Sequence, residues 1–440
     1  MLDRVVGMGL QLALVPILAA HWGLELYGVW AMLATLPAIL LLSDLGFATA
    51  ATVRMTMQIA RDEREAARVT LHSASQVVLV AGLAIMALAG AAALLVPDLA
   101  LSFRSGADPS HLRTALVCLA AYAVLIIGNG LVLAVFRSNE RFALGSLLST
   151  FTLLLENGLL VIVVVLGDGI AAGAMALLVG RGMGTAIGLI VAARLRTGML
   201  PGLRRGNRAV RSELIGPALA AMAIPMGLTL LLQGQVVALG AAAGAAAVPA
   251  FVAARTLSRI GLQLSQALAH PLIPEFGAAS ARGNQRGVLR MFALVLTVAT
   301  LIAVGFALLL AIAGPWIVHT WSAGHITVPR ETMWAIALSA LCGGIWNPVS
   351  NLMLAINRQA SFAPALVALA ALAVLVTLAL GHWLGTMAAA LSMAAVDLVM
   401  LIIVLRFGLY HWARPPDLYR TVMALAGEAR SEAGRFLRRG

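Results

Sequence analysis

The chain has 440 residues, of which 61% are hydrophobic and 11% are charged, and its mean hydropathy is +0.97. A soluble protein with so few charges and so much apolar surface would aggregate, so the composition indicates a polytopic membrane protein. All thirty basic residues are arginine, and the distribution of the +12 net charge along the chain argues against a nucleic-acid partner.

Twelve apolar runs are each long enough, at about 20 residues, to cross about 30 Å of hydrocarbon. They cover 3–21, 27–48, 72–96, 114–136, 143–166, 170–192, 214–238, 248–269, 291–313, 332–355, 362–380 and 385–405. The first run lacks a small-residue cleavage site, so we expect it to remain as a helix rather than to be removed as a signal peptide. Because the number is even, both ends of the chain are expected on one side of the membrane.

Arginine is unevenly distributed between the two sets of connections. Twenty-four of the thirty lie in the termini and in alternate connections, three lie in the opposite loops, and three lie inside spans. Cytoplasmic segments of membrane proteins carry an excess of basic residues, so this split predicts that both termini are cytoplasmic.

The longest basic connection separates six spans from six. The predicted parts are an N-terminal six-helix bundle at 1–193, a basic cytoplasmic linker at 194–213, a C-terminal six-helix bundle at 214–405 and a basic amphipathic cytoplasmic tail at 406–440. The tail is expected to form a helix on the anionic membrane surface.

A weak internal repeat supports two related halves. Thr35-Leu36 and Ala60-Arg61 return 221 positions later as Thr256-Leu257 and Ala281-Arg282. Repeated halves with a site at their interface are typical of alternating-access transporters. The predicted fold is therefore all-α, with about twelve transmembrane helices in two six-helix bundles related by pseudo-two-fold symmetry.

Enzymatic function is not expected. No connection exceeds about 22 residues, which leaves no room for a soluble catalytic or nucleotide-binding domain, and the chain lacks a glycine-rich phosphate loop. Cys118 and Cys342 fall inside spans and are expected to be packing residues, and the eight histidines lack the spacing of ligands. We therefore expect neither a cofactor nor a metal site.

Two arginines, Arg255 and Arg259, lie one helical turn apart, deep in the run 248–269. Positions four apart share a helix face, and a guanidinium near the bilayer centre costs about 2.5 to 3.5 kcal/mol unless it meets a partner or water. Two cations facing a water-filled interior suit an anionic substrate, above all phosphate, whose oxygens the guanidinium fork binds in pairs. The alternative is that they pair with Glu156, Asp397 or backbone carbonyls and only hold the helices together.

Other charged residues also lie within the spans. Glu156 and Arg181 are equally far from the loop that joins their spans, so they are placed to form an ion pair, either structural or acting as a gate or substrate contact. Asp397 lies mid-span in the last helix and is a candidate to neutralise an arginine or to carry a coupling proton. For Asp44, near the cytoplasmic surface, orienting a helix end is the simpler role and gating or ion coupling the alternative.

Four short segments follow a family pattern. They are Tyr27-Gly28-Val29-Trp30, Ser43-Asp44-Leu45-Gly46-Phe47, Arg137-Ser138-Asn139-Glu140-Arg141-Phe142 and Pro271-Leu272-Ile273-Pro274-Glu275-Phe276. They resemble the polysaccharide-biosynthesis flippases, the Wzx-type O-antigen and exopolysaccharide transporters of the multidrug/oligosaccharidyl-lipid/polysaccharide (MOP) superfamily. Hydropathy and the order of spans extend the resemblance over nearly the whole chain. One departure is that the chain enters its first span almost at Met1, where the family has a longer cytoplasmic lead.

The resemblance implies two bundles around a cavity that opens alternately inward and outward. The implied substrate is an oligosaccharide on undecaprenyl pyrophosphate, moved from the cytoplasmic to the periplasmic leaflet of the bacterial inner membrane. The basic cavity residues of the family would correspond to Arg255 and Arg259, with Arg181 as a third candidate. Besides the lipid bilayer, the implied partners are a glycan polymerase and other polysaccharide-assembly proteins.

Three other functions remain open from the sequence. A multidrug antiporter of the same superfamily should have an acidic cavity. Here the charged residues deep inside the spans are three arginines and two acidic residues, Glu156 and Asp397. A membrane glycan polymerase or ligase typically needs a large outer loop, and the outer connections are short. A scaffold without transport activity would have no use for the buried charges.

Overall fold

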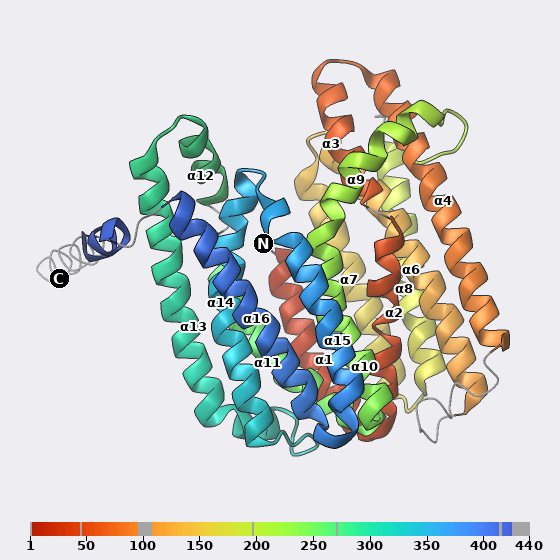
Figure 1. Cartoon of the computed structure of the whole chain (residues 1–440). Helices are drawn as coiled ribbons and strands as arrows, with labels where there is room; N and C mark the ends of the chain where they lie inside the picture. Colours follow the sequence, from red (N-terminus) through yellow and green to blue (C-terminus); the bar gives the residue numbers. More distant parts are fainter. Residues whose placement is uncertain are drawn as a thin grey trace, which may run out of the picture.

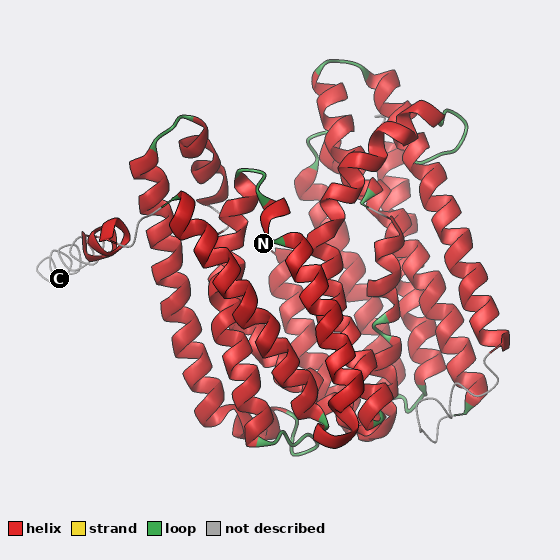
Figure 2. Cartoon of the chain, viewed as in Figure 1, coloured by secondary structure: helices red, strands yellow, loops and turns green. Residues whose placement is uncertain are grey.

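The computed structural model describes residues 2–44, 46–95, 108–195, 198–269, 272–412 and 416–424. Every regular element in these residues is helical, and no strand occurs among them (Figure 2). The prediction of an all-helical polytopic architecture is confirmed.

The N-terminal half begins with a helix of 32 residues, α1. Its helices are α1 (Leu2–Leu33), α2 (Leu36–Leu40), the 3-10 turn η1 (Leu41–Asp44), α3 (Phe47–Ala60), α4 (Arg64–Leu95), α6 (Pro109–Ser138), α7 (Phe142–Val165) and α8 (Ile170–Arg194).

The C-terminal half contains a π-helical turn in its first crossing. Its elements are α9 (Arg208–Thr229), the π turn η2 (Leu230–Gly234), α10 (Gln235–Ala243), η3 (Ala245–Ala247), α11 (Val248–Ala269), α12 (Leu272–Ala281), α13 (Gln285–Trp321), α14 (Arg330–Ala355), η4 (Gln359–Ser361), α15 (Ala363–Leu384) and α16 (Thr386–His411). A further helical segment covers 416–424, and the rest of the predicted surface helix in the tail lies outside the described residues.

Ten helices in the described part of the chain are long and apolar enough to cross a membrane. Val6–Leu40 counts as one of them, although the backbone at Gly23 is non-helical (φ 69°, ψ 174°) and separates the first predicted span from the second. α14 is not among the ten. It packs against α11, α13 and α16 and carries buried polar side chains such as Ser339 and Asn347. With α1 divided at Gly23 and α14 included, the helices follow the order of the twelve predicted spans.

The second predicted span, 27–48, is not a continuous helix. The helix stops at Ala34 and Thr35, because Pro37 has no backbone N–H to continue the hydrogen-bond ladder. After η1, Gly46 adopts a φ of 73°, and α3 then extends to Ala60. The predicted connection that carries Arg54 is thus largely helical, and the turn itself is short.

Short polar side chains mark where several helices begin. Caps of this kind satisfy backbone N–H groups in a first turn, which have no partner within the helix. The capping pairs are Asp108 with the N–H of Ser110 (2.8 Å), Asn207 with that of Ala209 (2.8 Å) and Asn284 with that of Gly287 (3.0 Å), at the starts of α6, α9 and α13. The backbone hydrogen bond from Ser110 lowers the pKa of the Asp108 carboxyl below its ordinary value.

The backbone breaks of the first half recur in the second. Left-handed φ angles occur in pairs whose members are 217 to 221 positions apart. These pairs are Gly23 (69°) and Gly244 (89°), Asp62 (61°) and Gly283 (66°), Glu140 (60°) and Asn357 (55°), and Gly167 (87°) and Gly385 (54°). The sequence repeat with an offset of 221 positions is therefore accompanied by a repeat of left-handed backbone angles at the ends of corresponding helices.

Helices pack mainly within their own half. In the first half α6 and α7 pack on α8, and α3 and α4 pack on each other and on α6; in the second, α14 packs on α13 and α16. The halves touch where α1 meets η3 and α11, and where α9 meets α3 and α4. Figure 1 shows the turns after α3 and α12 at its upper end, and the turns between α13 and α14 and between α15 and α16 at its lower end.

The contact between α1 and η3 depends on Gly28, because a Cβ atom there would lie 1.9 Å from the carbonyl oxygen of Ala245. We expect Gly28→Ala to destabilise the protein by about 1 to 3 kcal/mol through overpacking. Thermal unfolding in detergent, followed by tryptophan fluorescence, measures the effect. Gly9→Ala is the matched control, since nothing lies within 4 Å of its added Cβ. Equal melting temperatures for the two variants would contradict the close contact.

Candidate functional site

α11 carries both candidate substrate arginines, and its bounds, Val248–Ala269, coincide with the predicted span. It begins after the break at Gly244 and contacts α1 of the other half as well as α13 and α14 of its own. Arg255 and Arg259 are therefore carried by a helix that contacts both halves.

Arg255 is held by a backbone carbonyl. Its Nη1 donates a hydrogen bond to the carbonyl oxygen of Leu232 in the π turn η2, where the wider helix turn departs from the usual i to i+4 pairing. Its guanidinium carbon lies 5.6 Å from the centre of the Phe251 ring, and its electrostatic neighbours are Arg259 and Tyr27 of α1. Its Nε is buried without a hydrogen-bond partner. Arg255 therefore has a backbone carbonyl as a partner, as the alternative interpretation expects, but it has no carboxylate partner among the described residues.

Arg259 faces a cavity of about 40 Å³ inside the C-terminal half. That volume has room for a few water molecules. Asp397 of α16 and Trp346 of α14 also line this cavity. Among the described residues, Arg259 makes no hydrogen bond or ion pair. Its charge is therefore half-buried and free of a carboxylate partner.

Asp397 is bound by neutral donors instead of by an arginine. Its two carboxylate oxygens accept hydrogen bonds from Oγ of Ser339 (2.5 Å) and Nε1 of Trp346 (2.9 Å), and only 4% of the residue is exposed. Asp397 and Arg259 thus line one cavity without direct contact. This arrangement leaves room for water between a buried carboxylate and a guanidinium.

The predicted ion pair between Glu156 and Arg181 is confirmed. Nη2 of Arg181 lies 2.6 Å from Oε1 of Glu156, which also accepts a hydrogen bond from the Tyr122 hydroxyl at 3.1 Å. The side chains of Glu156 and Arg181 are 1% and 11% exposed. Gly180 permits the close approach of α7 and α8, since a Cβ atom there would lie 2.5 Å from Cα of Glu156. The charge of Arg181 is compensated within the N-terminal half.

Comparisons with known proteins place the helical architecture in a known fold. No family model and no curated protein matches the chain. Among solved structures, an inward-facing multidrug resistance MATE family transporter of the MOP superfamily matches over 91% of this chain and 93% of its own, with a TM-score of 0.75 and 14% identity. The chain has the MATE fold.

Two further structures support this fold assignment. An outward-facing multidrug resistance MATE family transporter matches over 93% of this chain and 92% of its own, with a TM-score of 0.61 and 15% identity. A MOP superfamily transporter from Pyrococcus furiosus covers 92% of this chain and 93% of its own, with a TM-score of 0.59 and 15% identity. At such low identity the likeness concerns the fold alone.

Within this MATE fold the predicted residues fall into separate groups. Arg255, Arg259 and Asp397 lie close together in the C-terminal half, whereas Glu156 and Arg181 form their own pair between α7 and α8. The backbone of Asp44 ends η1, and its side chain lies outside the described residues.

Sequence reasoning missed a polar cluster beside the π turn. Gln235 is fully buried and accepts a hydrogen bond from Oγ1 of Thr377 at 2.5 Å, and Thr377 contacts Oγ of Ser392 at 2.9 Å. The sequence signal that could have revealed the cluster is the pair of glutamines at 233 and 235 within an apolar span. The cluster joins α10, α15 and α16 next to the helix turn that holds Arg255.

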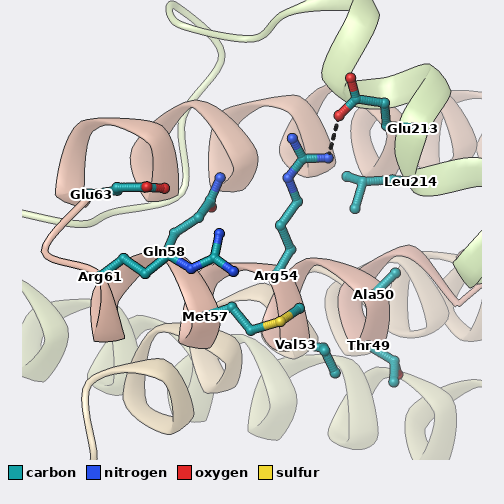
Figure 3. Close-up of a pocket in the computed structure, with 10 residues that line it drawn as sticks. All are labelled: Thr49, Ala50, Val53, Arg54, Met57, Gln58, Arg61, Glu63, Glu213 and Leu214. Carbon is teal, nitrogen blue, oxygen red and sulfur yellow. Dashed lines mark ion pairs between the residues drawn. The ribbon is translucent and has the colours of Figure 1, made fainter.

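A second, larger cavity lies between α3 and the start of α9, with a volume of about 560 Å³. Figure 3 shows Arg54 reaching from α3 toward Glu213, with an ion pair of 2.7 Å between them. Arg61 and Glu63 also line this cavity. Its two arginines are matched by two glutamates, so it has no net preference for an anion.

Removing the Arg54–Glu213 ion pair is expected to have a small effect. The side chains are 29% and 59% exposed, and exposed pairs contribute about 0 to 1 kcal/mol. Glu213→Gln should therefore lower the free energy of unfolding by less than about 1 kcal/mol, as measured by thermal unfolding in detergent. Glu63→Gln in the same cavity is the control. A loss of several kilocalories per mole for Glu213→Gln alone would show that the pair locks the halves together.

Proposed function

We propose that the protein is a transporter that flips an oligosaccharide linked to undecaprenyl pyrophosphate from the cytoplasmic to the periplasmic leaflet by alternating access. The observation that carries the proposal is the unpaired state of Arg259. Its guanidinium, half-buried in a membrane-spanning helix, has no carboxylate partner among the described residues, and Arg255 lies one turn away.

Two cations on one helix face favour an anionic cargo. A guanidinium is costly to place in hydrocarbon, and an anion that enters with it removes most of that cost. The planar fork of arginine binds two phosphate oxygens at once, so pyrophosphate suits a pair of arginines better than a carboxylate does. In this mechanism the pyrophosphate and sugars cross through the arginine-lined cavity while the prenyl chain stays in the lipid.

The remaining charged residues have supporting roles in the proposal. Arg181, compensated by Glu156, fixes α8 against α7 and is the weakest of the three candidate substrate contacts. Asp397 lines the same cavity as Arg259 and is the candidate for a coupling proton. Asp44 stays a prediction as a gate residue.

Topology and partners follow from the same proposal. The arginine distribution supports cytoplasmic termini in a bacterial inner membrane. The proposed partners are the glycan polymerase and other polysaccharide-assembly proteins that act on the flipped product. The protein itself acts as a transporter and not as an enzyme.

For the Pyrococcus furiosus transporter, reverse polarity of the binding pocket suggests a different function within the MOP superfamily. The arginines of α11 argue in the same direction for this chain.

The test is transport by the purified protein in vesicles. A lipid-linked oligosaccharide with an undecaprenyl pyrophosphate anchor is incorporated into proteoliposomes, and its exposure is followed with an impermeant glycosidase. We expect all of the glycan to become accessible with the protein and about half without it. Equal accessibility with and without the protein would exclude the flippase.

A multidrug antiporter is the second candidate, and Asp397 favours it. A buried carboxylate with neutral hydrogen-bond donors is the type of group that exchanges a proton for a cation. The same vesicles, loaded with ethidium under a pH gradient, separate the two functions. Ethidium efflux that is lost in Asp397→Asn, without glycan flipping, would favour the antiporter.

A further inference from the structure

A third cavity lies at one end of the C-terminal half, away from the arginines of α11. It has a volume of about 760 Å³ and is formed by the turn between α12 and α13, the end of α14, the end of α16 and the start of the helical segment 416–424. In Figure 1 these elements lie at the upper left of the molecule.

The cavity lies at the level expected for lipid head groups. α13 has 37 residues and is therefore about 55 Å long, well beyond the roughly 30 Å of hydrocarbon. The cavity is lined by Gln285 at the start of α13 and by His411 at the end of α16. Both residues mark helix ends that extend past the apolar part of the membrane.

Two arginines from separate elements face this cavity. Arg286 belongs to the first turn of α13, and Arg358 follows α14. Both are exposed, and neither makes an ion pair or a side-chain hydrogen bond among the described residues. Asp417 is the acidic residue in the lining, so the two arginines and this carboxylate together carry one net positive charge.

Aromatic rings form the wall beside the arginines. Phe407, Tyr410 and Trp412 line the cavity, and Trp412 is fixed by edge-on contacts with Phe276 (5.0 Å), Phe292 (5.3 Å) and Phe407 (5.7 Å). Tyrosine and tryptophan side chains prefer the membrane interface, where one edge is apolar and the other is wet. The wall therefore suits the glycerol backbone and upper acyl chain of a lipid.

We infer that this cavity binds one anionic phospholipid, with its phosphate between Arg286 and Arg358 and its acyl chains against Tyr410 and Trp412. Basic pockets between helices on the cytoplasmic side are suited to anionic head groups. One net positive charge in the cavity matches one net negative charge on the lipid. The site is independent of the transported cargo, so it stands whether the protein flips glycans or exports drugs.

The test counts lipids on the full-length protein by native mass spectrometry. Protein in detergent receives equal amounts of phosphatidylglycerol and phosphatidylcholine, and the bound species are identified. We expect one phosphatidylglycerol per protein, and on the order of tenfold lower occupancy in the double variant Arg286→Gln with Arg358→Gln. The matched control is Arg141→Gln with Arg204→Gln, which removes two exposed arginines from turns in the predicted cytoplasmic connections that do not line the cavity.

The outcomes separate the possible sources of the anion. Equal retention of phosphatidylcholine, or equal loss in the control and the site variant, would overturn the inference. Displacement of the lipid by millimolar inorganic phosphate would assign the arginines to a free anion and overturn the lipid claim. Because both arginines are exposed and unpaired, the site variant is expected to keep the melting temperature of the wild type, which keeps the measurement interpretable.

Discussion

Replacing Arg259 by alanine is expected to reduce flipping of the lipid-linked glycan by about 10- to 100-fold. The change removes charge-assisted hydrogen bonds to the pyrophosphate, which contribute about 1.5 to 3 kcal/mol. Arg259→Lys should fall between the wild type and the alanine variant, because lysine keeps the charge and loses the planar fork. The measurement is the initial rate of glycan exposure in proteoliposomes that contain equal amounts of protein.

Stability separates a transport defect from misfolding at this position. Arg259 has no described ion pair to lose, so Arg259→Ala should leave the melting temperature unchanged or raise it. Arg330→Ala, at the start of α14, is the control for removing an arginine outside the apolar segments. Wild-type transport by both Arg259 variants at normal protein levels would remove Arg259 from the proposed site.

Breaking the Glu156–Arg181 pair is expected to destabilise the protein by about 3 to 5 kcal/mol. Glu156→Gln leaves a guanidinium that is 11% exposed without its counter-charge inside the membrane-spanning part of the fold. The double variant Glu156→Gln with Arg181→Gln should recover much of that loss, because no uncompensated charge remains. Thermal unfolding of the wild type, of the single variants Glu156→Gln and Arg181→Gln, and of the double variant gives the coupling free energy by a double-mutant cycle.

Transport by the double variant then tests what the pair is for. Wild-type flipping with recovered stability would assign the pair a structural role, and lost flipping with recovered stability would assign it to gating or substrate contact. The exposed pair of Arg54 and Glu213 is the comparison, since removing its carboxylate should have a much smaller effect on stability. An unchanged melting temperature for Glu156→Gln would show that water or lipid head groups already neutralise Arg181.

The apolar crossings were predictable because hydrocarbon imposes both a length and a composition. α11 shows this, since the predicted and observed bounds are both 248–269. Outside the hydrocarbon that constraint disappears, and the secondary structure of the connections could not be predicted. α3 and α12 continue as helices through segments that were predicted as connections, because neither their hydropathy nor their length distinguishes a helix from a loop.

The contacts of the candidate site were predictable where they depend only on how deep each residue lies in the membrane. Glu156 and Arg181 stand equally far from one turn on neighbouring helices, so their contact follows from counting residues. The bond from Arg255 to Leu232 could not be predicted in this way, because a backbone carbonyl has no sequence signature and the π turn that presents it has none either. The separation of Asp397 from Arg259 depends on the side-chain packing of α14, which periodicity does not describe.

The π turn η2 sets the rotational phase of everything that follows it in the same crossing. One residue more than an α-helical turn requires shifts the later side chains by about 100° around the helix axis. A single helical wheel drawn across Leu230–Gly234 therefore misassigns the faces of α10.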